Sequence, residues 1–198
     1  MSQIALNKSN LSVQKRQKAA FQRYLPALEL KQKQLLAERK KAEQAFQEHQ
    51  QQIALLESEI YRKIPMLAES SINLYGLVKV THIEVRAENL LGTILPQLHN
   101  IEFSRAPYGF LARPHWVDEV VKALENMLRL KIEAQLLEKR VIRLVKASRT
   151  ITQRVNLFSK VLIPESEKTI GRIELFLADQ ERAAVVRSKL AKQKHQQA

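Results

Sequence analysis

The sequence predicts a mainly α-helical protein in which N- and C-terminal helices form a long antiparallel two-helix coiled coil, with a small β-hairpin knob between them. Helix breakers gather in the middle of the chain, because four of the six prolines and three of the four glycines lie within residues 65–115. The flanks are rich in Lys, Gln, Glu, Leu and Ala, which favour helix. Both flanks also repeat apolar residues at heptad spacing. We therefore expect three parts, covering residues 1–64, 65–115 and 116–198.

The N-terminal part carries apolar residues in alternating steps of four and three from Phe21 to Ile60. A period near 3.5 residues is typical of helices that supercoil on a partner. The pattern predicts a helix over residues 11–64. Pro26 lacks an N–H and clashes with the preceding turn, so we expect it to kink or restart this helix.

The middle part has a different period. Apolar and polar residues alternate through 77–86, as in a partly buried strand, and the run 93–103 is suited to a returning strand. Pro96 favours an edge or bulge position because it cannot donate to a strand ladder. This part is predicted to form the hairpin.

A second heptad pattern runs from Val117 to Leu162 and predicts the C-terminal helix, with a kink or restart near Pro164. If the chain folds back near residue 90, this pattern faces the first one and each buries the apolar side of the other. The predicted seam between the helices includes Leu28, Leu35, Val141, Val155, Phe158 and Leu162.

The charge is strongly basic, with 33 Lys and Arg against 20 Asp and Glu and a formal net charge of +13. The excess lies on the two helical parts. A band without acidic residues follows Glu138 on the second helix, and such a concentrated field favours an acidic or polar partner surface. A solvated helix face that only keeps the protein soluble is the competing interpretation. The band contains Lys139, Arg140, Arg143, Lys146, Arg149 and Arg154.

Several function classes are excluded. The chain has no cysteine, and its four glycines are too scattered for a phosphate-binding loop. The five histidines lack metal-site spacing and no nucleophile motif is present, so we expect no catalytic residue, metal or cofactor. The basic face has few aromatic residues to stack bases, which argues against nucleic acid. We expect no membrane span and no signal peptide, and a cytoplasmic location.

Four strings resemble the rotor-shaft (D) subunits of the V-type and A-type ATPases. They are VKVTHIEVRAEN with the following LLG, WVDEVVKALE from Trp116, RVNLFSKVLIP from Arg154 to Pro164, and EKTIGRIELFLADQERAAVVRSKLAKQK near the C-terminus. The similarity covers most of the chain, in the order helical arm, central knob, helical arm.

This resemblance implies a central rotor shaft that couples ATP hydrolysis or synthesis in a catalytic hexamer to proton or sodium transport through a membrane ring. The implied partners are the catalytic and regulatory hexamer subunits, the small F-type stalk subunit and a funnel-shaped adaptor on the ring. The shaft would lie at the cytoplasmic face of the membrane, and the basic band would form the hexamer bearing. A generic basic coiled-coil scaffold or adaptor remains the alternative, followed by a basic rod that binds nucleic acid.

Overall fold

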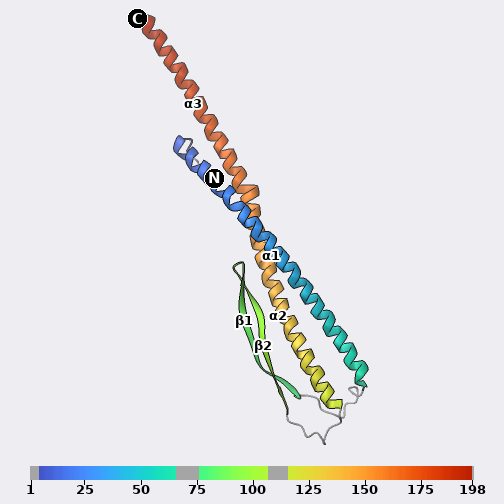
Figure 1. The fold of residues 1–198 in the computed structure, drawn as a ribbon. Coiled ribbons are helices and arrows are strands. Elements are labelled where there is room, and N and C mark those ends of the chain that lie inside the picture. The colour runs from blue at the N-terminus through green and yellow to red at the C-terminus, as the bar shows by residue number, and fades with distance from the viewer. Residues whose placement is uncertain (1–4, 66–75, 107–115, 198) are drawn as a thin grey trace. The chain divides into compact units, whose positions relative to one another are not determined.

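The computed structural model describes residues 5–65, 76–106 and 116–197. The fold is mainly α with a central antiparallel hairpin, as predicted, while the parts of the expected knob at 66–75 and 107–115 lie outside the described residues (Figure 1). The elements are α1 (Lys8–Lys63), β1 (Val78–Leu90), β2 (Thr93–Arg105), α2 (Trp116–Leu157), the π-helical segment η2 (Phe158–Leu162) and α3 (Ile163–Gln197).

Contacts divide the chain into two compact units. The first unit combines the chain up to Gln32 with the chain from Thr150 onward, and the second runs from Lys33 to Arg149. Each helical arm therefore contributes to both units, and the hairpin belongs to the second.

Within the first unit the N- and C-terminal helices run antiparallel. Lys15 lies 2.7 Å from Glu174 and Lys18 lies 3.0 Å from Glu167, while Gln32 donates to the Thr152 hydroxyl at 2.9 Å. The partner number falls as the α1 number rises, which is the pairing of an antiparallel coil. Of the predicted seam positions in this unit, Val155 is buried, and Leu28, Phe158 and Leu162 are half-buried.

The same antiparallel order holds within the second unit. His49 lies 3.2 Å from Glu133, and further along α1 the carboxylate of Glu57 lies 3.3 Å from Lys131. The predicted seam residue Leu35 is 1% exposed, and Val141 is half-buried.

The helix α1 begins at Lys8, three residues before the predicted start, and continues through Pro26. Asn7 caps its N-terminus, because the side-chain oxygen accepts a hydrogen bond from the Asn10 N–H at 2.8 Å. The expected restart at Pro26 does not occur. A missing hydrogen bond and a ring clash cost about 3 kcal/mol, and the packed turns on both sides of the proline, with Leu25 and Leu28 half-buried, offset this cost.

The C-terminal helix changes its hydrogen-bonding pattern just before Pro164. In η2 the bonds span five residues, so the N–H of Ile163 donates to the carbonyl of Phe158. Pro164 is then the second residue of α3, directly after η2. The hydroxyls of Ser159 and Ser166 donate to backbone carbonyls one turn back, at Val155 and Leu162.

The two strands of the hairpin pair from Val78 with Arg105 to Leu90 with Thr93. The register shifts between Val80 and His82 and between Glu84 and Val85, so the pairing contains two irregularities. Pro96 pairs with Ala87 and lies outside both shifts. In a two-stranded sheet both strands have a free edge, which accommodates the proline.

The turn between the strands requires a left-handed conformation at two residues. Leu91 has φ 52° and Gly92 has φ 81°, as in the two-residue turns that match the twist of a hairpin. Asn89 supports the turn by accepting a hydrogen bond from the Gly92 N–H at 2.9 Å. A leucine in this conformation costs about 1–2 kcal/mol because its Cβ approaches the following carbonyl.

Replacing Leu91 with Asn is expected to stabilise the hairpin by about 1 kcal/mol, because asparagine tolerates the left-handed region. Hydrogen exchange of the β1 and β2 amides measures the effect. The matched control is Leu90→Asn, since Leu90 has no positive φ and should gain nothing from the change. Equal or faster exchange in the Leu91 variant would contradict this account of the turn.

A small apolar core fixes the base of the hairpin. Leu77, just before β1, is buried with Val117 and Val121 from the first turns of α2, and Val78 and Trp116 pack against them. This cluster joins the start of the hairpin to the start of the helix.

Candidate functional site: the hairpin and the basic face of the second helix

The hairpin lies along α2 (Figure 1). A series of side-chain contacts joins the two elements. Successive hairpin positions from the base to the tip meet successive turns of the helix. The contacts are Arg105 with Glu125 at 2.6 Å, the Phe103 ring with the Arg129 guanidinium at 5.9 Å, Glu88 with Arg140 at 2.6 Å, and the Ile94 carbonyl with Arg143 at 2.9 Å.

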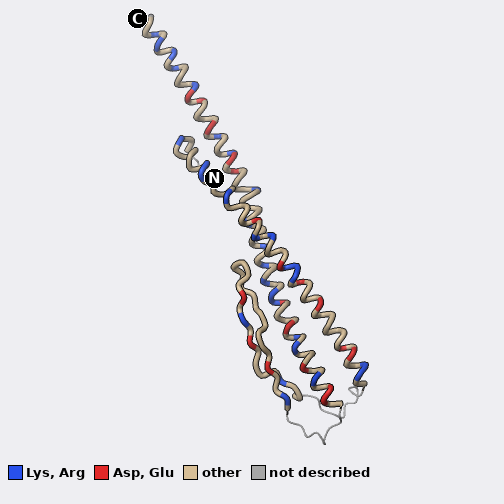
Figure 2. The backbone as a smooth tube through the Cα atoms, in the orientation of Figure 1, with Lys and Arg blue, Asp and Glu red and all other residues tan. Residues whose placement is uncertain are grey.

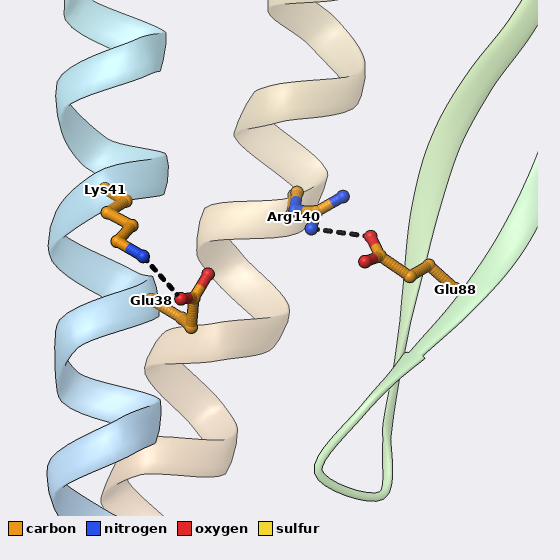
Figure 3. A network of polar contacts seen from close by, with 4 residues as sticks. All are labelled: Glu38, Lys41, Glu88 and Arg140. Carbon is orange, nitrogen blue, oxygen red and sulfur yellow. Dashed lines mark hydrogen bonds and ion pairs between the residues drawn. The ribbon is translucent and has the colours of Figure 1, made fainter.

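Two of the six residues predicted for a bearing surface thus bind the hairpin. The guanidinium of Arg140 points from α2 to Glu88 on β1 (Figure 3). The Arg140 side chain is only 21% exposed. Arg143 donates to the carbonyl of Ile94 beside the turn. Figure 3 also shows a pair within α1, in which Lys41 lies 2.9 Å from Glu38.

The remaining predicted cations lie on the surface. Lys139, Lys146 and Arg149 are exposed within the second unit, and Arg154 is exposed within the first. Figure 2 shows α2 with blue cationic positions along its length. These four side chains keep the charge that the sequence predicts for the band.

Exposed apolar side chains were not singled out from the sequence. Ile142 is 60% exposed and Val145 is 37% exposed, and residues three apart share a helix face. On α3, Val185, Val186 and Leu190 are each more than half exposed. For Ile142 and Val145, the available signal was that both lie off the heptad pattern that runs from Val117 to Leu162.

A pocket of about 420 Å³ opens between the middle of β2 and the two helices of the second unit. His49 lies on one wall, where its Nδ1 is 3.0 Å from the Ala45 carbonyl and its Nε2 is 3.2 Å from Glu133. These two contacts account for both ring nitrogens of His49. The lining comprises His49, Pro96, Gln97, Leu98, His99, Asn100, Ile101, Arg129, Glu133, Leu136, Leu137 and Arg140.

The ion pair of Arg105 and Glu125 at the base of the hairpin changes the pKa of the Glu125 carboxyl. Hydrogen bonds from Arg105 to Glu125, at 2.6 Å and 2.9 Å, lower the pKa of the Glu125 carboxyl below its ordinary value of 4.5. Partial burial acts in the opposite direction, and the charges of Arg105 and Arg129 lower the pKa further. The hydrogen-bonded carboxylate is therefore favoured in the folded chain.

This pair predicts an acid-sensitive contribution to stability. Because the folded pKa of Glu125 is lowered, the contribution is complete above the ordinary value of 4.5 and is lost as the pH falls through the folded pKa. Urea unfolding should separate wild type from Glu125→Gln at pH 7 and bring them together in acid. A separation that is the same at both pH values would contradict the prediction.

Metal-binding clusters and membrane-spanning helices are both absent from the described ranges. No group of three or more His, Asp or Glu side chains there is arranged to hold a metal ion. Among the described residues, no helix is both long and apolar enough to cross a membrane.

Comparison with known proteins gives one consistent result. The family model for the D subunit of ATP synthase matches residues 10–193. The chain is 34% identical to the V-type ATP synthase D subunit of Borreliella burgdorferi, over 97% of this chain and 95% of the relative. It is 31% and 32% identical to the proteins of the same name from Chlamydia abortus and Chlamydia felis, over 99% of this chain and 95% of each relative.

Proposed function

Because the chain belongs to the D-subunit family of ATP synthases, we propose that it is the central rotor shaft of a V-type ATP synthase. In this role it couples ATP hydrolysis or synthesis in the catalytic hexamer to proton or sodium transport through the membrane ring. It is a peripheral, non-catalytic component at the cytoplasmic face. The family match across nearly the whole chain carries the proposal.

The antiparallel helix pairs support a mechanical role. A shaft must transmit torque without unwinding, and each unit packs its helices along an apolar seam with cross-helix ion pairs at its edges. Its sides are chemically different, so rotation presents a different surface to each catalytic interface. Each catalytic interface is then biased toward a different conformational state, since a contact with the shaft shifts the equilibrium between two states only when it favours one of them.

The exposed cations are suited to the hexamer bearing. Lys139, Arg149 and Arg154 are exposed and can face polar or acidic surfaces of the catalytic and regulatory subunits. Arg140 and Arg143 serve the bearing indirectly, because they position the hairpin. This refines the six-residue set proposed from sequence.

Two further partners complete the proposal. The exposed pair Ile142 and Val145 offers an apolar face to the small F-type stalk subunit. The base of the hairpin, fixed by Leu77 and Val117, is suited to seating in the funnel-shaped adaptor on the membrane ring.

A salt-dependent co-purification tests the bearing. Replacing Lys139, Arg149 and Arg154 together with Glu is expected to lower recovery of the hexamer subunits at least about tenfold at 0.15 M salt, because exposed charges still interact over a Debye length of about 8 Å. The matched control reverses three exposed cations elsewhere, at Arg62, Lys79 and Lys122.

The control is expected to retain more than half of the wild-type recovery. Equal losses in the two variants would assign the effect to net charge rather than to a bearing. Wild-type chain that recovers nucleic acid or unrelated proteins, with no ATP synthase subunits, would favour the basic scaffold or the nucleic-acid rod and would overturn the proposal.

A further inference from the structure

The part of β2 that borders the pocket lies between two positions at which the hairpin is anchored. On the tip side, Leu95 is fully buried and Glu88 binds Arg140 at 2.6 Å. On the base side, Arg105 binds Glu125 through two hydrogen bonds. The residues between these anchor points, 96–101, form one wall of the pocket.

A β-bulge shapes this wall. Glu84 pairs with Asn100 and Val85 pairs with Leu98, so His99 is an extra residue on β2 with no strand partner. A bulge bends its strand and redirects the side chains around it. The bulge residue His99 is one of the pocket-lining residues. The opening therefore follows from the strand geometry.

The pocket lining includes two arginines and two histidines, and two of these four side chains are not held by an acid at hydrogen-bond distance. His49 contacts Glu133 and Arg140 contacts Glu88, which occupies these two side chains. Arg129 lies over the Phe103 ring and acts on Glu125 through its charge. The Nε2 atom of His99 lies 3.9 Å from Glu84, which is beyond hydrogen-bond length.

The apolar part of the lining is half-buried, with Leu136 and Leu137 on α2 and with Pro96, Leu98 and Ile101 on β2, while Gln97 and Asn100 add two exposed polar side chains. Pockets that hold small organic ligands usually measure about 300–1,000 Å³ and combine apolar walls with a few polar groups. The volume of about 420 Å³ falls in this range.

We propose that this pocket binds a small amphipathic anion, such as an aryl carboxylate or sulfonate. Its acidic group would lie against the Arg129 guanidinium and the His99 imidazole, and its apolar body against Leu136 and Leu137. A guanidinium presents several N–H donors in one plane, which suits a carboxylate or sulfonate. Every residue involved lies in the second unit of this chain, and binding of the ligand does not require the rotor-shaft role.

Titration calorimetry of the full chain with naphthalene-1-sulfonate tests the site. We expect saturable binding of one probe per chain, and binding at least about tenfold weaker in Arg129→Gln, because a charge-assisted hydrogen bond is lost. Leu137→Trp, which fills the apolar end, should abolish binding. Arg149→Gln removes the same charge from an exposed position on the same helix and should change affinity less than about twofold.

Two companion probes define the ligand class. Uncharged 1-naphthalenemethanol and inorganic sulfate should each bind at least about tenfold more weakly than the sulfonate, since each lacks one half of the recognised chemistry. The methyl NMR signals of Leu95 should stay unchanged in both pocket variants, which shows that the hairpin remains docked.

Absence of saturable sulfonate binding to wild type would overturn the proposal. Equal affinity for the uncharged probe, or equal weakening by Arg149→Gln and Arg129→Gln, would also overturn it. If Arg129→Gln displaces the hairpin, the Leu137→Trp variant decides the outcome alone, and retained binding in that variant would place the probe elsewhere.

Discussion

Replacing Val155 and Phe158 together with Asp is expected to open the helix pair of the first unit and to uncouple ATP hydrolysis from ion transport. Val155 is 9% exposed, and the Phe158 ring meets Phe21 edge to face with centroids 5.4 Å apart. One buried and one half-buried apolar side chain are lost, and the two carboxylates that replace them lose water without gaining a partner, which costs at least about 4 kcal/mol. Urea unfolding of the isolated chain measures the loss, and the ratio of ions moved to ATP hydrolysed in the reconstituted complex measures coupling.

Leu157→Asp is the matched control for this pair. Leu157 lies between the two positions in sequence but is 46% exposed, so its replacement adds one carboxylate, where the double variant adds two, without opening the seam. Its effect on stability should stay within about 1 kcal/mol. Normal coupling in the double variant, with unfolding confirmed to be easier, would show that torque does not pass through this seam.

Leu95→Asp is expected to release the hairpin tip from α2 and to destabilise the second unit by about 3 kcal/mol. Leu95 is 0% exposed on β2, so the carboxylate would be buried without a partner and the leucine contacts would be lost. Hydrogen exchange of the β1 and β2 amides should accelerate strongly, while amides in the first unit keep their wild-type protection.

The neighbouring residue supplies the control. Ile94 is 60% exposed and offers only its backbone carbonyl to Arg143, so Ile94→Asp keeps that hydrogen bond and buries no charge. Protection of the strand amides should then stay close to wild type. Equal acceleration in both variants would mean that the tip is not anchored through Leu95.

Periodic features were predictable because they depend on neighbours in sequence. Heptad spacing identified Leu35 and Val155 as buried seam residues, and alternation identified the first strand of the hairpin, with the returning strand expected in the run 93–103. Each of these patterns reports which face of an element is apolar, and burial follows that face. The helix over 11–64 was predicted, but the restart expected at Pro26 does not occur, because packing outweighs the local penalty of the proline.

The docking of the hairpin could not be predicted. Arg140 and Glu88 are far apart in sequence. Because Arg140 belongs to a basic band, its sequence position is equally consistent with an exposed surface charge. Arg143 binds a backbone carbonyl, that of Ile94, which has no side-chain signal at all. The bulge at His99, and with it the pocket, depends on a one-residue difference in strand register that alternation cannot resolve.

The π-helical segment η2, a wide turn of the C-terminal helix, makes this helix tolerant of the gain or loss of one residue at one place. The heptad pattern alternates steps of four and three residues, but Phe158, Leu162 and Ser166 are separated by two steps of four. The π-helical segment η2, whose hydrogen bonds span five residues, takes up this one extra residue. Ile173, further along, is therefore still fully buried. A deletion of one residue within 158–162 would restore regular phase, whereas the same deletion near Val155 or Ile173 would rotate the seam away from its partner. Gains and losses of single residues in this helix should accordingly accumulate at the wide turn.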